Sequence, residues 1–163
     1  MRDIRRLPIF SSIPTSFVSV VALALGTACS APTFDEPKSG VSAVQLGAEM
    51  SGYRFDPATI DSAHVVGDIL HLHLSYGGCG THAVALLQTG PFMESFPVQV
   101  PLSLAHDASG EACRMLVRSQ ERFDLTALKE SYRKAYGSGG TMLLQVRAPG
   151  ATPAVTAVRY EFR

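Results

Sequence analysis

The chain has 163 residues, of which 46% are apolar, and its 14 basic and 14 acidic residues balance to a formal charge of zero. That length and apolar content are sufficient for one domain with its own hydrophobic core. Three of the basic residues and one of the acidic residues lie within the first six positions, so the remainder carries a net charge of −2. The sequence has no basic patch or arm, which argues against a nucleic-acid partner.

The first 28 residues have the pattern of a bacterial export signal. Arg2, Arg5 and Arg6 provide a positively charged start, and residues 17–25 form an apolar run. That run is too short to span a bilayer, which needs about 20 residues. We therefore predict that residues 1–28 are a signal peptide and that the rest of the chain is exported.

The end of the leader, Leu25-Gly26-Thr27-Ala28-Cys29, resembles a bacterial lipobox. In that family of signals the cysteine receives a diacylglycerol and becomes the new N-terminus. Gly26 departs from the pattern, which has an aliphatic residue there, so cleavage after Ala28 into a periplasmic or secreted protein is the alternative. We predict a lipid on Cys29 that holds the protein at the outer membrane, with the membrane as its partner.

Residues 29–47 are rich in Ser, Pro, Ala and Gly and have no clear period, which predicts a flexible tether. Residues 48–163 are predicted to form the folded domain. A short strand is expected at 62–66, followed by a turn at Gly67-Asp68. Strand 69–76 then alternates between two faces; one carries Leu70, Leu72, Leu74 and Tyr76, and the other carries His71, His73 and Ser75.

Further strands are predicted from the same alternation, at 81–87, 96–104, 113–117, 141–146 and 158–162. Pro97 and Pro101 cannot donate to a ladder, so strand 96–104 is predicted at a sheet edge or with a bulge. Leu125, Leu128 and Tyr132 fall at helical spacing, which predicts one short helix near 125–136. About seven short strands separated by frequent turns predict an antiparallel β-sandwich, immunoglobulin-like in general architecture.

The three cysteines are Cys29, Cys79 and Cys113. If Cys29 carries the lipid, two remain, and in an oxidising compartment an even number of cysteines predicts a disulfide. A Cys79–Cys113 bridge would close a loop that stabilises the domain by roughly 4 kcal/mol in the chain-entropy model. We favour this pairing.

A metal centre is the alternative for the same residues. Cys79, His82, His106 and Cys113 together supply two sulfurs and two imidazoles, the ligand set of a structural zinc site. His71 and His73 also share one strand face, and a His-x-His pair can chelate zinc or copper. For those two histidines we favour a solvated sheet face.

A thiol nucleophile with a histidine base is a third possibility, using Cys79 with His82 or Cys113 with His106. It requires a free thiolate in an oxidising compartment and an orienting group that the sequence does not identify. The sequence contains no P-loop, dinucleotide fingerprint, HExxH or GxSxG motif. We therefore predict that the protein is not an enzyme; a thiol hydrolase is the alternative.

The pattern GGCxxH at 77–82, His106-Asp107, Cys113 and FDLxxL at 123–128 resembles an uncharacterised group of small bacterial envelope lipoproteins. The resemblance spans about residues 65–162 and implies a β-rich envelope protein without implying an activity. The sequence thus predicts a lipid-anchored, non-catalytic binding or structural module of the cell envelope that needs no cofactor. It names no protein or small-molecule partner.

Overall fold

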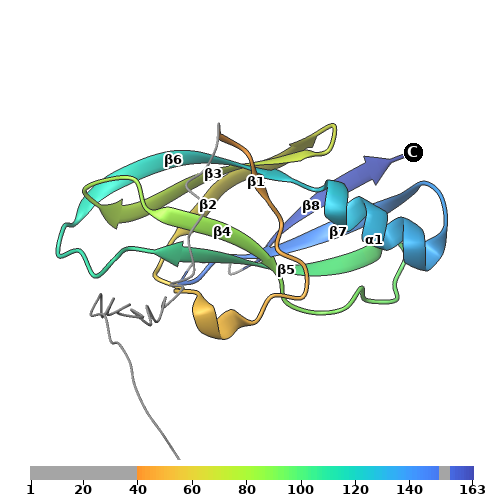
Figure 1. The fold of residues 1–163 in the computed structure, drawn as a ribbon. Coiled ribbons are helices and arrows are strands. Elements are labelled where there is room, and N and C mark those ends of the chain that lie inside the picture. Colours follow the sequence, from red (N-terminus) through yellow and green to blue (C-terminus); the bar gives the residue numbers. More distant parts are fainter. Residues whose placement is uncertain (1–39, 151–154) are drawn as a thin grey trace, which may run out of the picture. The chain divides into compact units, whose positions relative to one another are not determined.

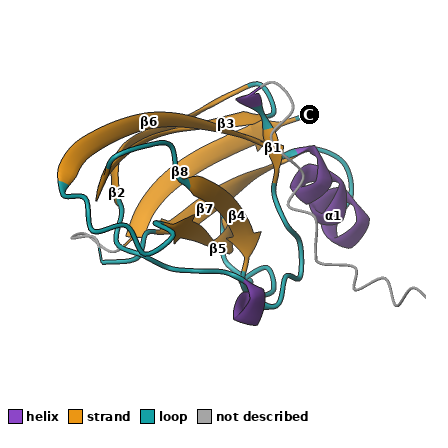
Figure 2. Ribbon diagram, turned by 60° about the vertical axis from the view of Figure 1, so that its left-hand side comes forward, coloured by secondary structure: helices purple, strands orange, loops and turns teal. Residues whose placement is uncertain are grey.

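The computed structural model describes residues 40–150 and 155–163. The predicted signal peptide, Cys29 and residues 30–39 of the predicted tether lie outside the described residues. Within these ranges, two four-stranded sheets pack face to face, with one α-helix beside them (Figures 1 and 2). The predicted mainly β sandwich with one short helix is confirmed.

The first sheet has the strand order β1-β6-β3-β2. Its strands are β1 (Ser42–Ala43), β6 (Met115–Asp124), β3 (Ile69–Gly78) and β2 (Thr59–Val66). β1 runs parallel to β6, and the other two pairings are antiparallel. Because β1 pairs within this sheet and Val44 is buried, the sandwich begins before residue 48, inside the segment predicted as tether. A single 3-10 turn, Met50–Gly52, lies between β1 and β2.

The second sheet has the strand order β4-β5-β7-β8. Its strands are β4 (Ala83–Gln88), β5 (Val98–Asp107), β7 (Gly140–Arg147) and β8 (Val155–Phe162). β5 and β7 are parallel, so the sheets are mixed rather than purely antiparallel. The reason is that β6 lies between them in sequence but belongs to the other sheet, so the chain returns to the second sheet in its original direction.

The core lies between the two sheets and follows the predicted alternation. β3 contributes Leu70, Leu72, Leu74 and Tyr76, and β5 contributes Val98, Val100, Leu102 and Leu104, all of them buried. The second sheet adds further buried residues to this layer: Met142, Leu144 and Val146 of β7, Leu86 of β4, and Val158 and Tyr160 of β8. Phe96 precedes β5 and is exposed, so the predicted strand starts two residues too early.

β5 is a central strand with an unbroken register to both neighbours, so the prediction that its prolines place it at an edge or in a bulge is wrong. Pro97 lies before the strand begins. The carbonyl of Pro101 accepts a hydrogen bond from the Thr89 N–H, just beyond the end of β4 at Gln88. In a strand the nitrogen and carbonyl of one residue point to the same side, so the missing N–H of Pro101 also faces the space past β4 and removes no ladder bond.

The helix α1 (Thr126–Tyr136) follows β6 and ends at Gly137, whose positive φ of 100° favours glycine. Asp68, in the β2–β3 turn, fastens it to the sheets. Asp68 accepts the Leu125 N–H through its carbonyl, forms an ion pair with Lys129 and accepts the Tyr160 hydroxyl at 2.6 Å. The Lys129 ammonium and then the Tyr160 hydroxyl hold the pKa of Asp68 below its ordinary value, while burial raises the pKa of Tyr160.

Candidate functional site

The sequence motifs around Cys79 and Cys113 meet at one end of the sandwich, where the chain crosses between the sheets twice. The β3–β4 connection leaves the first sheet for the second, and the β5–β6 connection returns. Cys79 lies in the first crossing and Cys113 in the second, and a disulfide joins them with their Cα atoms 5.6 Å apart. The predicted pairing therefore ties together the two crossings.

Two histidines lie close to these crossings, one from the first crossing and one from the end of β5. His82 comes just before β4 and His106 near the end of β5, and their side chains are almost fully buried, His82 being 2% exposed and His106 1%. Nδ1 of His82 lies 2.8 Å from Nε2 of His106. The Tyr76 ring packs against both imidazoles, with 4.6 Å between centroids in each case. We call His82 and His106 the buried histidine pair.

Each ring nitrogen of the buried histidine pair has a hydrogen-bonding partner. Nδ1 of His106 faces the Asp56 carbonyl at 3.1 Å, and Nε2 of His82 faces a Glu111 carboxylate oxygen at 3.4 Å. Both outer partners are acceptors, so each outer nitrogen is placed to donate a hydrogen bond. The contacts therefore hold both imidazoles in fixed orientations.

Glu111, in the β5–β6 connection, contacts both His82 and the backbone of Cys79. The same oxygen that faces His82 accepts the Cys79 backbone N–H at 2.9 Å. These two contacts, the backbone one first, hold the pKa of Glu111 below its ordinary value of 4.5. The carboxylate itself is exposed, so its attraction to the histidine is screened by solvent.

The position of the His82 ring requires a glycine at position 78, immediately before Cys79. A Cβ atom at Gly78 would lie 2.4 Å from Cε1 and 2.5 Å from Nε2 of the His82 ring. His82 cannot move aside without losing its contacts to Tyr76 and His106. The absence of a side chain at Gly78 therefore lets the imidazole pack directly on the backbone of β3.

The structure gives the residues of the zinc alternative a different arrangement. Cys79, His82, His106 and Cys113 do come together, but the two sulfurs are bonded to each other and the two imidazoles to each other. In residues 40–150 and 155–163, no group of three or more His, Cys, Asp or Glu side chains is placed to hold a metal ion. As a disulfide, the sulfurs also cannot serve as the thiol nucleophile of the hydrolase alternative.

His71 and His73 lie on the outer face of the first sheet, away from this cluster. A third histidine, His64, stands directly opposite His71 on β2. Sequence analysis missed His64, although a two-residue turn at Gly67-Asp68 would have placed it there: pairing outward from Val66 and Ile69 sets 64 against 71. Glu111 and Asp56 were also missed, and no spacing pattern in the sequence points to them.

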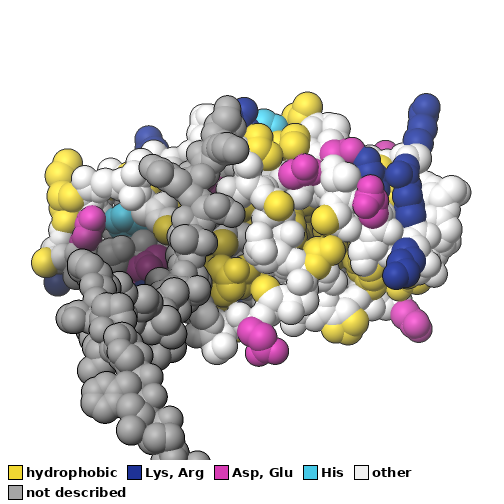
Figure 3. Space-filling model, in the orientation of Figure 1, with side chains coloured by type: hydrophobic (Ala, Val, Ile, Leu, Met, Phe, Trp, Pro, Cys, Tyr) yellow, Lys and Arg dark blue, Asp and Glu magenta, His cyan; other side chains and the backbone are white. Residues whose placement is uncertain are grey.

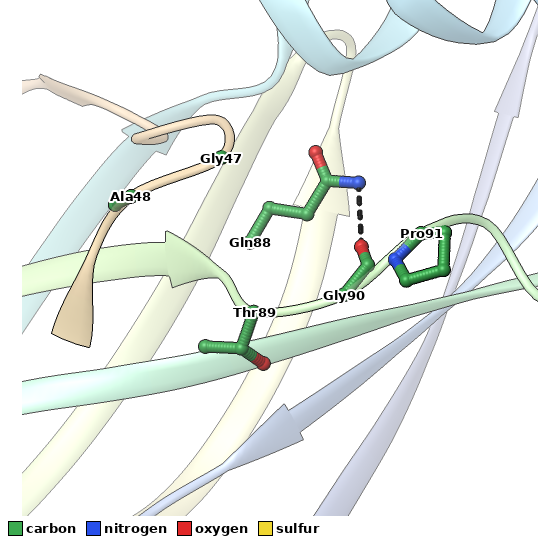
Figure 4. A pocket seen from close by; sticks show the side chains of 6 residues that line it. All are labelled: Gly47, Ala48, Gln88, Thr89, Gly90 and Pro91. Carbon is green, nitrogen blue, oxygen red and sulfur yellow. Dashed lines mark hydrogen bonds between the residues drawn. The ribbon is translucent and has the colours of Figure 1, made fainter.

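Two other surface features are a hollow at the end of β4 and a face of mixed charge. A shallow hollow of about 370 Å³ at the end of β4 is lined by Gly47, Ala48, Gln88, Thr89, Gly90 and Pro91 (Figure 4). The Gln88 side chain donates to the Gly90 carbonyl at 2.9 Å, so its amide is directed to the loop backbone. The face shown in Figure 3 carries basic and acidic side chains side by side.

The fold is shared with solved structures, whereas no protein-family model and no curated protein matches the chain. Its class is a two-sheet β-sandwich. A NigD-like immunity protein from Bacteroides caccae has the same fold with a TM-score of 0.54 and 18% identity, over 77% of this chain and 65% of its own. A DUF1344 protein of unknown function from Bacteroides vulgatus has a TM-score of 0.51 and 14% identity, over 76% of this chain and 57% of its own.

These likenesses show the fold and no more. The chain spans about two thirds or less of the length of both proteins, and at such identities a common fold does not define a common activity. In the described part of the chain, no helix is long and apolar enough to cross a membrane.

Proposed function

We propose that this protein is exported to the bacterial cell envelope, is held at a membrane by a lipid on Cys29, and acts there as a non-catalytic binding module. The Cys79–Cys113 disulfide carries the proposal, because disulfides persist in oxidising compartments and are rare in the cytosol. The export signal at residues 1–28 agrees with that compartment. Cys29 at the end of the signal supplies a lipid acceptor.

The chemistry of the disulfide end supports binding rather than catalysis. The sulfurs are bonded to each other, and the buried histidine pair is closed by Glu111 at one side and the Asp56 carbonyl at the other. Groups engaged in this way hold two chain crossings in place, and they leave the neighbouring exposed residues on a rigid support. Met115 and Leu116 lie there at the start of β6, 66% and 69% exposed.

The anchor is tested by comparing the wild-type protein with a Cys29→Ser variant in the bacterial cell. We expect the wild type to partition with membranes and to carry a diacylglycerol on its N-terminal residue by intact mass. The variant should be exported without the lipid and recovered in the soluble fraction. A mature wild-type protein that begins at Cys29 without a lipid would contradict the anchor and indicate a soluble exported protein instead.

The binding role is tested by placing a photo-crosslinking amino acid at Leu116 in cells. Val66 is a matched control, since it is another exposed aliphatic residue, 59% exposed, in the β2–β3 hairpin. We expect a discrete crosslinked product from position 116 and none from position 66. The absence of any product from position 116, in protein whose disulfide is intact, contradicts a binding surface at this end.

A further inference from the structure

Three of the five histidines in the chain lie together on the outer face of the first sheet. His71 and His73 occupy alternate positions of β3, whose intervening residues are buried in the core. His64 of β2 is the cross-strand partner of His71, and His73 pairs with Ser62. We call His64, His71 and His73 the outer histidine trio.

Within the outer histidine trio, the His64 ring stacks close to both of the others. The centroids of His64 and His71 are 4.9 Å apart and those of His64 and His73 are 6.3 Å apart. His64 is exposed, and the other two are half-buried. No hydrogen bond to another described residue occupies a ring nitrogen of His64 or His71, so these nitrogens are free to bind.

We propose that His64, His71 and His73 form a surface site for a divalent ion of the zinc and copper class, with Cu²⁺ held most tightly. Imidazole nitrogen is a ligand that both ions favour, and the stability order of divalent first-row metals places Cu²⁺ highest. Residues two apart on a strand face lie about 7 Å apart, and direct cross-strand partners are closer, at about 5 Å between Cβ atoms. Three such side chains can converge above the sheet on one ion and leave a further position open.

As the side chains stand, the outer histidine trio is not placed to hold an ion, and neither is any other group of three such ligands in the described residues. Binding therefore requires a local side-chain movement, because the His64 and His71 rings stack almost parallel, with 8° between their planes. His64 must turn so that its nitrogen, rather than its ring face, points to the centre of the trio. An exposed side chain changes rotamer on the picosecond to nanosecond scale, while the two paired strands keep all three Cα positions fixed. The movement therefore involves one side chain on a rigid frame.

The neighbouring strand β6 supplies a supporting group and one opposing charge. The Gln120 amide lies 3.5 Å from Nδ1 of His73, where its oxygen could instead accept the Nδ1–H and leave Nε2 for the ion. Arg122 is the cross-strand partner of His71 on the other side. Its guanidinium donates to the Gly40 carbonyl at 2.7 Å, which directs that positive charge toward the chain segment before β1.

The other cysteine and histidine side chains of the described residues are already engaged. The thiols of Cys79 and Cys113 are joined in the disulfide, and the facing nitrogens of the buried histidine pair bind each other. In the described residues of the oxidised protein, the outer histidine trio is therefore the imidazole cluster that remains available to an added divalent ion.

The test is titration of Cu²⁺ and Zn²⁺ separately into untagged, oxidised protein, with binding followed by calorimetry. We expect one ion per chain, tighter binding of Cu²⁺ than of Zn²⁺, and nitrogen hyperfine splitting in the electron paramagnetic resonance spectrum of the Cu²⁺ complex. Acidification should release the ion, because only neutral imidazole binds it.

Variants on the same face decide whether the trio is the site. His64→Gln should weaken Cu²⁺ binding by at least about tenfold, since even outer-shell partners contribute that much, and replacing all three histidines by glutamine should abolish it. Ser75→Ala, on the same face of β3 but without an imidazole, should leave binding unchanged. Retained binding in the triple variant, or an unaltered affinity in His64→Gln, overturns the proposal. Neither result depends on the lipid anchor or on the crosslinking outcome.

Discussion

The buried histidine pair and the outer histidine trio use the same side chain for opposite purposes. At the disulfide end, Tyr76, Glu111 and the Asp56 carbonyl surround His82 and His106, so every ring nitrogen has a partner. On the outer face, His64 and His71 contact each other only through their ring faces. Burial and completed hydrogen bonding make the first group part of the fold, while exposure leaves the second available to a ligand.

The largest expected effect comes from removing the covalent link beside the buried histidine pair. A double Cys79→Ala/Cys113→Ala variant should lose about 4 kcal/mol of unfolding free energy, because the bridge closes a sequence separation of 34 residues. Urea unfolding of oxidised wild type and of the variant measures the difference. A loss well under 1 kcal/mol would mean that the noncovalent contacts of the two crossings suffice to hold this end.

The two histidine groups are compared directly by making one substitution in each. His106→Phe leaves a buried His82 nitrogen and the Asp56 carbonyl without their partners, which should cost about 2–3 kcal/mol. His71→Phe, on the outer face, should change the unfolding free energy by no more than about 0.5 kcal/mol. Equal losses in the two variants, measured by urea unfolding, would contradict the distinction between a structural pair and an available trio.

Alanine substitutions at the adjacent glycines Gly77 and Gly78 test how closely His82 packs on β3. Gly78→Ala brings a methyl group into the His82 ring and should cost about 1–3 kcal/mol through overpacking. Gly77→Ala is the matched control, because a Cβ there meets nothing within 4 Å and Gly77 is exposed. The control should lie within about 0.5 kcal/mol of wild type. The nuclear magnetic resonance signals of His82 and His106 should shift in Gly78→Ala and not in Gly77→Ala.

The sequence predicts the parts of the fold that depend on local pattern. The alternation of β3 and the spacing of Leu125, Leu128 and Tyr132 each reflect one element facing one core, and both are confirmed. The parallel pairing of β5 with β7 is a long-range arrangement that no single strand encodes. Likewise, Pro101 suggests an edge strand until the end of β4 beside it is known.

The candidate site likewise has features that the sequence predicts and features that depend on distant parts of the chain. Compartment and cysteine count predict the Cys79–Cys113 link, and a histidine near each cysteine in the sequence points to His82 and His106 as its companions. That the imidazoles bind each other depends on Glu111 and Asp56, which come from a loop and from a distant segment. The pairing of His64 with His71 could have been predicted from the turn alone, because a two-residue hairpin loop fixes the register of its two strands.

The smallest expected effect concerns the charge that closes the buried histidine pair from solvent. The pKa of Glu111 is lowered in the folded protein, so its carboxylate stabilises the fold at pH values above the ordinary value of 4.5. That contribution is lost as the pH falls through the lower folded pKa. Glu111→Gln should therefore be slightly less stable than wild type at neutral pH, and the two should converge in acid. Glu94→Gln, at an exposed position in the β4–β5 loop, should parallel wild type throughout, whereas a Glu111→Gln deficit that persists unchanged into acid would mean that packing, not charge, is responsible.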